Sequence, residues 1–166
     1  MVYAKKSYGQ HFLKTESVCQ KIVESAEIGS DDLVVEVGPG RGALTKWLAP
    51  VTKNLILIET DQEMIDSLSE YDVEIIKADA AQVDFCEVAK AQPWTLVGNL
   101  PYNAGTAIVM NALTSKCPPK CLIVMLQKEV ANKMMAKPGQ MSLLSVAVQM
   151  YATPSRVIDV KPGSFS

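Results

Sequence analysis

Short apolar runs alternate with amphipathic stretches along most of the chain, and this alternation restricts the fold more than any other feature. Runs rich in Leu, Ile and Val predict buried strands, and apolar residues at every third or fourth position predict helices. Strands are expected at 33–37, 55–59, 73–78, 94–98, 121–126 and 156–160, and helices at 18–26, 43–48, 61–69, 85–89, 106–113, 128–135 and 142–150. Because strands that alternate with helices form a parallel sheet covered on both faces, we expect an α/β protein with a doubly wound sheet.

Length and hydrophobicity restrict the organisation of the chain. It has 166 residues, of which 48% are hydrophobic, so one compact domain is expected and two are not. The longest apolar runs, 55–58 and 122–126, are far shorter than the roughly 18 residues that a membrane helix needs. The first residues lack the apolar core of a signal peptide. We therefore expect a cytoplasmic protein with no membrane contact, in a reducing compartment.

The four cysteines do not form a complete metal site. Cys117 and Cys121 have the one short spacing, but no second pair completes the four ligands of a zinc centre. Cys19, Cys86 and the single His11 lie far away in the sequence. The sequence therefore predicts four reduced thiols and no bound metal.

The formal net charge of −2 argues against a protein that coats nucleic acid by bulk attraction, because phosphate binding depends on clustered Lys and Arg. A local basic rim remains compatible with this total. Its candidates are Lys5, Lys6, Lys14, Arg41, Lys128, Lys133 and Lys137. Each of them, taken singly, is equally compatible with an ordinary solvated side chain.

A glycine-rich turn at 38–42, Gly-Pro-Gly-Arg-Gly, separates the first expected strand from the following helix. Glycine has no Cβ and accepts positive φ, so the backbone of such a turn can approach a ligand closely. In open α/β sheets the ligand binds at the carboxyl ends of the strands, where the strand order reverses. Gly38 and Gly40 are therefore candidate ligand contacts. With Ala43 and Glu59, they also satisfy the dinucleotide fingerprint, which keeps a dinucleotide oxidoreductase open as an alternative.

Three acidic residues at successive strands favour S-adenosylmethionine as the ligand. Glu36 precedes the glycine turn by two residues, where a carboxylate offsets the positive charge of a sulfonium and repels a pyrophosphate. Glu59, which ends the second strand, can accept hydrogen bonds from both ribose hydroxyls. Asp79, after the third strand, can accept one from the adenine amine of the cofactor. Each acid alone is also compatible with a solvated strand end.

The segment 99–102, Asn-Leu-Pro-Tyr, directly follows the fourth expected strand. Asn99 supplies an amide oxygen, and the residue before Pro101 presents a backbone carbonyl that is kept out of a helix. These two acceptors can hold both hydrogens of an exocyclic amine, and Tyr102 offers an aromatic face to an extruded base. The segment therefore predicts a site for a nucleobase with an exocyclic NH2 group.

An adenine amine is a poor nucleophile, because its lone pair is delocalised into the ring. Acceptors that hold its hydrogens can favour a pyramidal nitrogen whose lone pair points at the sulfonium methyl group. The nitrogen becomes acidic once it has attacked, so its proton can pass to water and no strong base is required. Asn99, Pro101 and Tyr102 are accordingly the candidate catalytic residues.

Taken together, these motifs resemble the ribosomal RNA adenine N6-dimethyltransferase family, which includes small-subunit dimethylases and erythromycin-resistance methylases. The resemblance extends over essentially the whole chain. Its ordered matches are Tyr-Gly-Gln-His-Phe-Leu at 8–13, the stretch from Val35 to Thr45, Ile-Glu at 58–59, Ala-Asp-Ala at 78–80, Gly-Asn-Leu-Pro-Tyr at 98–102, Leu-Gln-Lys-Glu-Val-Ala at 126–131 and Leu-Ser-Val at 144–146. Seven ordered matches are far more specific than any one of them.

The resemblance assigns roles to individual residues. It implies cofactor contacts from His11, Leu13, Gly38, Glu59, Asp79 and Asn99. It also implies that Asn99 and Tyr102 meet the target adenine and that Phe165 stacks on the other face of that base. The implied fold is a Rossmann-like methyltransferase sheet.

The resemblance also implies a substrate and partners. We expect N6,N6-dimethylation of adenosines in small-subunit ribosomal RNA, with the pre-ribosomal small subunit as partner and the enzyme as a monomer. A large-subunit methylase of the macrolide-resistance type and a noncatalytic nucleic-acid-binding relative remain alternatives.

The sequence departs from the family pattern after Phe165. Family members continue with a proline-rich turn, a seventh strand and a small helical domain that helps to grip RNA. We therefore expect residues 1–166 to be a catalytic domain without its C-terminal strand and helical domain, with unpaired strand edges. Cofactor binding with impaired RNA methylation is the expected result.

Overall fold

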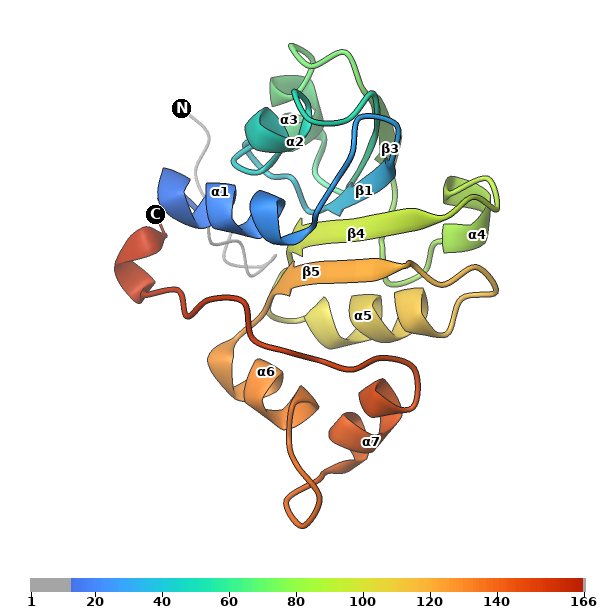
Figure 1. The fold of residues 1–166 in the computed structure, drawn as a ribbon. Coiled ribbons are helices and arrows are strands. Elements are labelled where there is room, and N and C mark those ends of the chain that lie inside the picture. Colours follow the sequence, from blue (N-terminus) through green and yellow to red (C-terminus); the bar gives the residue numbers. More distant parts are fainter. Residues whose placement is uncertain (1–12, 166) are drawn as a thin grey trace.

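A parallel β-sheet forms the centre of the molecule (Figure 1). The computed structural model describes residues 13–165, and this part of the chain contains five strands. They are β1 (Leu33–Val37), β2 (Asn54–Glu59), β3 (Glu74–Lys77), β4 (Trp94–Asn99) and β5 (Cys121–Met125), in the order β3-β2-β1-β4-β5. The predicted doubly wound α/β fold is therefore confirmed.

Helices cover both faces of this sheet. One face is covered by α1 (Glu16–Ser25), α2 (Thr45–Leu48) and α3 (Gln62–Ser67), and the other by α4 (Phe85–Val88), α5 (Gly105–Leu113), α6 (Lys128–Met134) and α7 (Leu143–Gln149). A short 3₁₀ turn, η2 (Pro162–Ser164), lies near the end of the described chain. Because both faces are covered, the three inner strands are apolar at nearly every position rather than at alternate ones.

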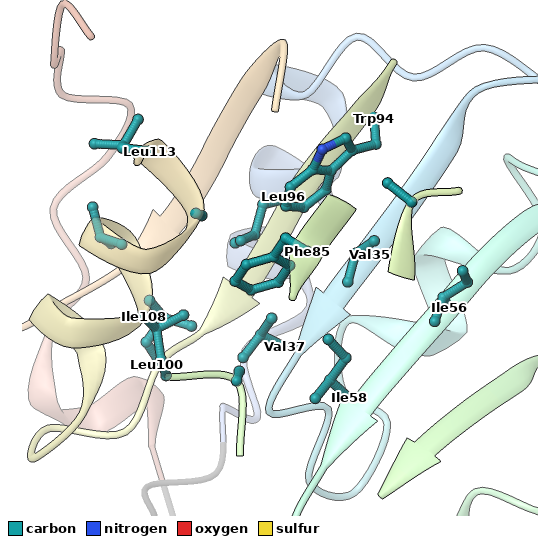
Figure 2. Close-up of a cluster of buried hydrophobic side chains, with 14 of the residues drawn as sticks. Val35, Val37, Ile56, Ile58, Phe85, Trp94, Leu96, Leu100, Ile108 and Leu113 are labelled. Carbon is teal, nitrogen blue, oxygen red and sulfur yellow. The ribbon is translucent and has the colours of Figure 1, made fainter. Parts of the chain in front are cut away.

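Side chains of the inner strands alternate between two apolar cores. In β1, Val34 packs with the helices of the first face and Val35 with those of the second. Figure 2 shows the second core, in which the rings of Phe85 and Trp94 stack with centroids 5.0 Å apart. Val37 and Ile58 lie at the end of this core where their strands stop. The carboxyl ends of β1 and β2 are thus held by packing on the second face.

Side-chain caps determine where several helices begin. The Asp61 carboxylate accepts a hydrogen bond of 3.1 Å from the Glu63 amide at the start of α3, and the Asp84 carboxylate accepts one of 2.8 Å from the Cys86 amide at the start of α4. Ser142 and Ser145 form a reciprocal capping box at α7. These caps give α3 and α4 defined starting points despite their short lengths.

The sixth strand predicted at 156–160 is wrong. This segment has no strand pairing in the structure, and Val157 and Ile158 remain exposed. Arg156 instead bonds the side chains of Asn132 on α6 and Asp159. An apolar run becomes a strand only when a neighbouring edge supplies ladder hydrogen bonds, and here none of the described strands does so.

The prediction of four reduced thiols is also wrong. Cys86 on α4 and Cys117 in the loop before β5 form a disulfide with their Cα atoms 5.0 Å apart. The two cysteines are separated by 31 residues, so local spacing does not reveal the pair. Cys19 and Cys121 are free thiols.

Candidate functional site

A crevice of about 270 Å³ opens at the carboxyl ends of the strands. It lies where β1 and β4 are neighbours although β2 and β3 intervene between them in the sequence. From this point the connections run outward in opposite directions, so the loops that follow the two strands diverge. The crevice is lined by Leu13, Ile108 and the segments 36–41, 43–44, 58–60, 78–80 and 99–104.

The glycine turn forms one wall of the crevice. Gly38 has φ +67° and Gly40 has φ +54°, a region that L side chains rarely adopt. The Gly38 amide donates a hydrogen bond of 3.0 Å to the carbonyl of Ile58, and a Cβ on Gly38 would lie 3.4 Å from the Asn99 carbonyl oxygen. Gly38 therefore stands close to both neighbours of β1, with its backbone in the crevice.

Glu59 connects the glycine turn to the end of β2. Its Oε2 accepts a hydrogen bond of 3.2 Å from the Gly40 amide, and its Oε1 accepts bonds from the amides of Thr60 (2.8 Å) and Asp61 (3.1 Å). The side chain is only 7% exposed, yet the residue lines the crevice. The carboxylate thus fixes the turn and faces the ligand space at once.

Glu36 lies at the base of the crevice and is 1% exposed. The pKa of its carboxyl is raised from 4.5 to about 8; burial is the largest cause, the hydrogen bond from Thr45 acts in the opposite direction, and the nearby charge of Glu59 adds to the rise. The sequence predicts a charged carboxylate at Glu36. The structure corrects this reading, because the buried carboxyl keeps its proton at neutral pH, and the argument against a pyrophosphate ligand loses that support.

Asp79 lies in the turn that follows β3 and lines the crevice. Its Oδ1 accepts a hydrogen bond of 2.9 Å from the Ala81 amide, and its Oδ2 accepts one of 3.2 Å from Nε2 of Gln82. The carboxylate is exposed, so its remaining acceptor positions face solvent and the crevice.

The segment 99–102 forms the opposite wall. Asn99 ends β4 and is half-buried, whereas Tyr102 is 42% exposed. The amide of Leu100 donates to the Met125 carbonyl (3.2 Å), and the Pro101 carbonyl accepts from the Gly105 amide (2.8 Å) at the start of α5. Within residues 13–165, no backbone amide donates to the Leu100 carbonyl.

Leu13 and Phe165 bring the two ends of the described chain together. They form an antiparallel bridge, and the Lys14 amide donates to the Ser164 carbonyl at 2.9 Å. Leu13 lines the crevice, whereas Phe165 is half-buried behind it and does not. The predicted contact at His11 lies outside the described residues. Apart from His11 and Phe165, the predicted site residues line one crevice: Leu13, Glu36, Gly38, Gly40, Glu59, Asp79, Asn99, Pro101 and Tyr102.

Sequence reasoning missed several residues that support the site. Thr45 belongs to a quoted motif, but nothing in its neighbourhood indicated that its hydroxyl bonds Glu36 at 2.8 Å. Asn111 on α5 gave no signal, because its backbone partners lie 28 and 31 residues away. Of the expected basic rim, Arg41 is the member that lines the crevice in the described part of the chain.

In residues 13–165, no cluster of three or more His, Cys, Asp or Glu side chains suited to a metal ion occurs. None of the helices in this range combines the length and hydropathy that crossing a membrane requires.

Comparison of the sequence with known families gives one match over residues 1–166, to the family described as ribosomal RNA adenine dimethylase. Ribosomal RNA small subunit methyltransferase A of Lachnoclostridium phytofermentans is 40% identical over 173 residues, which cover 97% of this chain and 60% of that protein. The protein of the same name from Clostridium botulinum strain Langeland is 41% identical over 168 residues, with 96% and 61% covered. The chain therefore spans about 60% of the length of these curated relatives.

Two solved structures are similar over most of the chain. A dimethyladenosine transferase from Plasmodium falciparum superposes with a TM-score of 0.81 at 28% identity, over 93% of this chain and 57% of that one. The 23S rRNA methyltransferase ErmE superposes with a TM-score of 0.68 at 29% identity, over 81% and 55%.

Proposed function

The chain belongs to the ribosomal RNA adenine dimethylase family, and from this membership we propose that residues 1–166 are a catalytic domain that uses S-adenosylmethionine to methylate N6 of adenosine in ribosomal RNA. One observation carries the proposal. The glycine turn, Glu59, Asp79 and the segment 99–102 come from four separate parts of the sequence and line the same crevice.

The residues of the crevice fit the proposed cofactor. The positive φ angles of Gly38 and Gly40 give it a backbone wall without side chains, and Ile58 and Ala80 add apolar surface for a flat ring. In the proposal Glu59 accepts from the ribose hydroxyls and Asp79 accepts from the adenine amine, with Leu13, Glu36 and His11 as further contacts. When bound, the cofactor supplies a methyl group on a positively charged sulfur.

The segment 99–102 receives the target adenine. The Asn99 amide oxygen and the Leu100 carbonyl accept the two hydrogens of the exocyclic amine, and the exposed Tyr102 ring stacks on the base. Acceptors held in this way orient the nitrogen lone pair toward the cofactor side of the crevice. The proton that the nitrogen loses passes to water. Phe165 is given no contact with the base in this proposal, because it does not line the crevice.

Small-subunit ribosomal RNA is the proposed substrate. The support comes from the curated relatives at about 40% identity, which are named as small-subunit methyltransferases. We propose the pre-ribosomal small subunit as partner, the cytoplasm as location, and a monomer as the working form. The similarity to ErmE makes large-subunit RNA the competing substrate.

Two measurements test this function. Calorimetric titration of the 166-residue chain with S-adenosylmethionine and with NAD should give binding of the first and none of the second, whereas binding of NAD alone would support the dinucleotide alternative. Mass analysis of ribosomal RNA from cells that lack the gene should show loss of dimethyladenosine from the small subunit. Loss from the large subunit would assign the chain to the resistance type.

The catalytic assignment has its own variants. In cells that lack the gene, a reintroduced gene should restore dimethyladenosine in the ribosomal RNA when it carries Asn54→Ala. It should fail to do so when it carries Asn99→Ala or Tyr102→Ala. Asn54 is a suitable control because it also carries an amide side chain but lies at the opposite end of the sheet, at the start of β2. Restored dimethyladenosine with Asn99→Ala would refute the role of this residue.

A further inference from the structure

Helix α5 carries an amide side chain that bonds the loop after β3. Nδ2 of Asn111 donates hydrogen bonds to the carbonyl of Ala80 at 3.1 Å and to that of Val83 at 2.9 Å. Asn111 is half-buried, so these bonds are partly shielded from water. One side chain thus satisfies two carbonyls of an irregular segment.

Apart from the bonds to Asn111, the backbone of the loop 79–83 makes few hydrogen bonds to the backbone of the rest of residues 13–165, although its apolar side chains pack on the core. The Asp79 carbonyl accepts from the amides of Gln82 and Val83, which closes the turn upon itself. Just before the turn, the Ala78 amide donates to the Glu59 carbonyl at 3.1 Å. Asn111 therefore provides the polar anchor at the far side of the turn.

Helix α5 also reaches the opposite wall of the crevice. Its first residue, Gly105, donates its amide to the Pro101 carbonyl, and Ile108, one turn before Asn111, lines the crevice. In Figure 2, Ile108 lies beside Leu100, which belongs to the segment 99–102. The helix therefore joins the wall that holds the proposed target base to the loop that carries Asp79.

We propose that Asn111 is a positioning residue that holds the loop 79–83 in the shape that receives the adenine ring of the cofactor. The inference rests on the proposed function, since it assigns the ring to the Asp79 side of the crevice. Two donated hydrogen bonds keep the Ala80 backbone against the crevice and so hold Asp79, the preceding residue, in place for the adenine amine.

The test measures ligand selectivity rather than stability alone. The 166-residue chain and its Asn111→Leu variant are titrated with S-adenosylhomocysteine and with S-inosylhomocysteine, in which a carbonyl replaces the adenine amine. We expect Asn111→Leu to bind S-adenosylhomocysteine about tenfold more weakly, and to lose most of the wild-type preference for it over the inosyl analogue. A purely structural role would weaken both ligands equally and leave the preference unchanged.

Asn54→Leu is the matched control. Nδ2 of Asn54 likewise donates to a backbone carbonyl, that of Asp31 at 3.0 Å, but at the amino end of β2. Thermal unfolding of the ligand-free proteins compares the stability losses of the two variants. Asn54→Leu should keep both the affinity and the preference of the wild-type chain.

A smaller change guards against a folding defect. Asn111→Ser retains one hydroxyl donor, so its losses of affinity and of ligand preference should be about half of those of Asn111→Leu on a logarithmic scale. If Asn111→Leu does not unfold cooperatively, the Asn111→Ser variant provides the test. Unchanged preference in a folded Asn111 variant overturns the positioning role and leaves the proposed function intact. Failure of the wild-type chain to bind S-adenosylhomocysteine overturns both.

Discussion

The Thr45 hydroxyl donates a hydrogen bond of 2.8 Å to Oε2 of Glu36, and both side chains are buried. Glu36 belongs to the strand before the glycine turn, and Thr45 is the first residue of the helix after it. The bond therefore closes the base of the turn. The carboxyl group can be accommodated in the core because it has this hydrogen-bond partner and because burial raises its pKa, which favours the uncharged form.

Replacement of Thr45 by Val keeps the shape of the side chain and removes the donor. We expect a loss of about 1–3 kcal/mol in the free energy of unfolding, because a buried carboxyl oxygen is left without its partner. The pKa of Glu36 should rise above 8, since the Thr45 bond lowers it. Urea unfolding measures the loss. Thr114→Val is the control, because that hydroxyl bonds the Met110 carbonyl on an exposed helix end, and equal losses in the two variants would contradict the prediction.

The raised pKa of Glu36 predicts how stability depends on pH. Between pH 4.5 and about 8 the unfolded chain ionises this residue while the folded chain keeps it protonated, so the folded state binds more protons. The free energy of unfolding should therefore fall as pH rises through this window, by roughly 1.4 kcal/mol per pH unit for this group, and level off above it. Glu36→Gln removes this contribution. Urea unfolding at several pH values in the window should show a difference between wild type and variant that changes with pH; parallel profiles would show that Glu36 does not titrate in this way.

Glu59→Gln tests the link between the glycine turn and the end of β2. The carboxylate accepts from the amides of Gly40, Thr60 and Asp61, and an amide nitrogen cannot replace an acceptor oxygen in this arrangement. We expect an affinity for S-adenosylhomocysteine about 10- to 100-fold lower by calorimetry. The exposed Glu87 on α4 serves as the control, and Glu87→Gln should bind as the wild type does. An unaltered affinity in Glu59→Gln would remove this residue from the site.

Gly98 allows β4 to approach β1 closely before the segment 99–102. A Cβ at this position would lie 2.6 Å from the Val37 carbonyl oxygen and 2.9 Å from Cδ2 of Leu100. Gly98→Ala should therefore destabilise the protein by about 1–3 kcal/mol, because the backbone must move. Gly163→Ala, where nothing lies within 4 Å, should change stability by less than about 0.5 kcal/mol. Similar melting temperatures for the two variants would argue against the close contact.

The disulfide predicts a thiol count. Titration of the unfolded chain without reductant should find two thiols, those of Cys19 and Cys121, and reduction should release two more from Cys86 and Cys117. Because the bond closes a loop of 31 residues, reduction should lower the free energy of unfolding by roughly 3–4 kcal/mol. Cys86→Ser should reproduce this loss. Four thiols before reduction would show that the bond does not form.

Much of this arrangement follows from local sequence signals. The alternation of apolar runs predicts the five strands to within one or two residues, and the glycine turn at 38–42 predicts where the ligand space begins. Glu59, Asp79 and Asn99 are predictable as residues that line the crevice, because each stands at or just after the end of a parallel strand. The position of a residue relative to a strand end is a local property, so it can be predicted from the sequence.

The features that the sequence does not predict depend on contacts between distant parts of the chain. A strand at 156–160 requires a partner edge, the Cys86–Cys117 bond requires two loops to meet, and the role of Asn111 depends on carbonyls about 30 residues away. The protonated state of Glu36 depends on burial by the whole core. Each of these features depends on contacts between residues far apart in the sequence, so the neighbouring residues in the sequence do not predict it.

The crevice between β1 and β4 is not built by a single stretch of chain. One side comes from the chain up to residue 80 and the other from the chain after residue 98, and the two halves of the sheet meet only along the pairing of β1 with β4. A molecule in which only one half of the sheet is folded therefore lacks the crevice. The number of binding sites found by ligand titration should therefore equal the number of molecules in which the whole sheet is folded. The ligand should also raise the melting temperature of the sheet in a single transition.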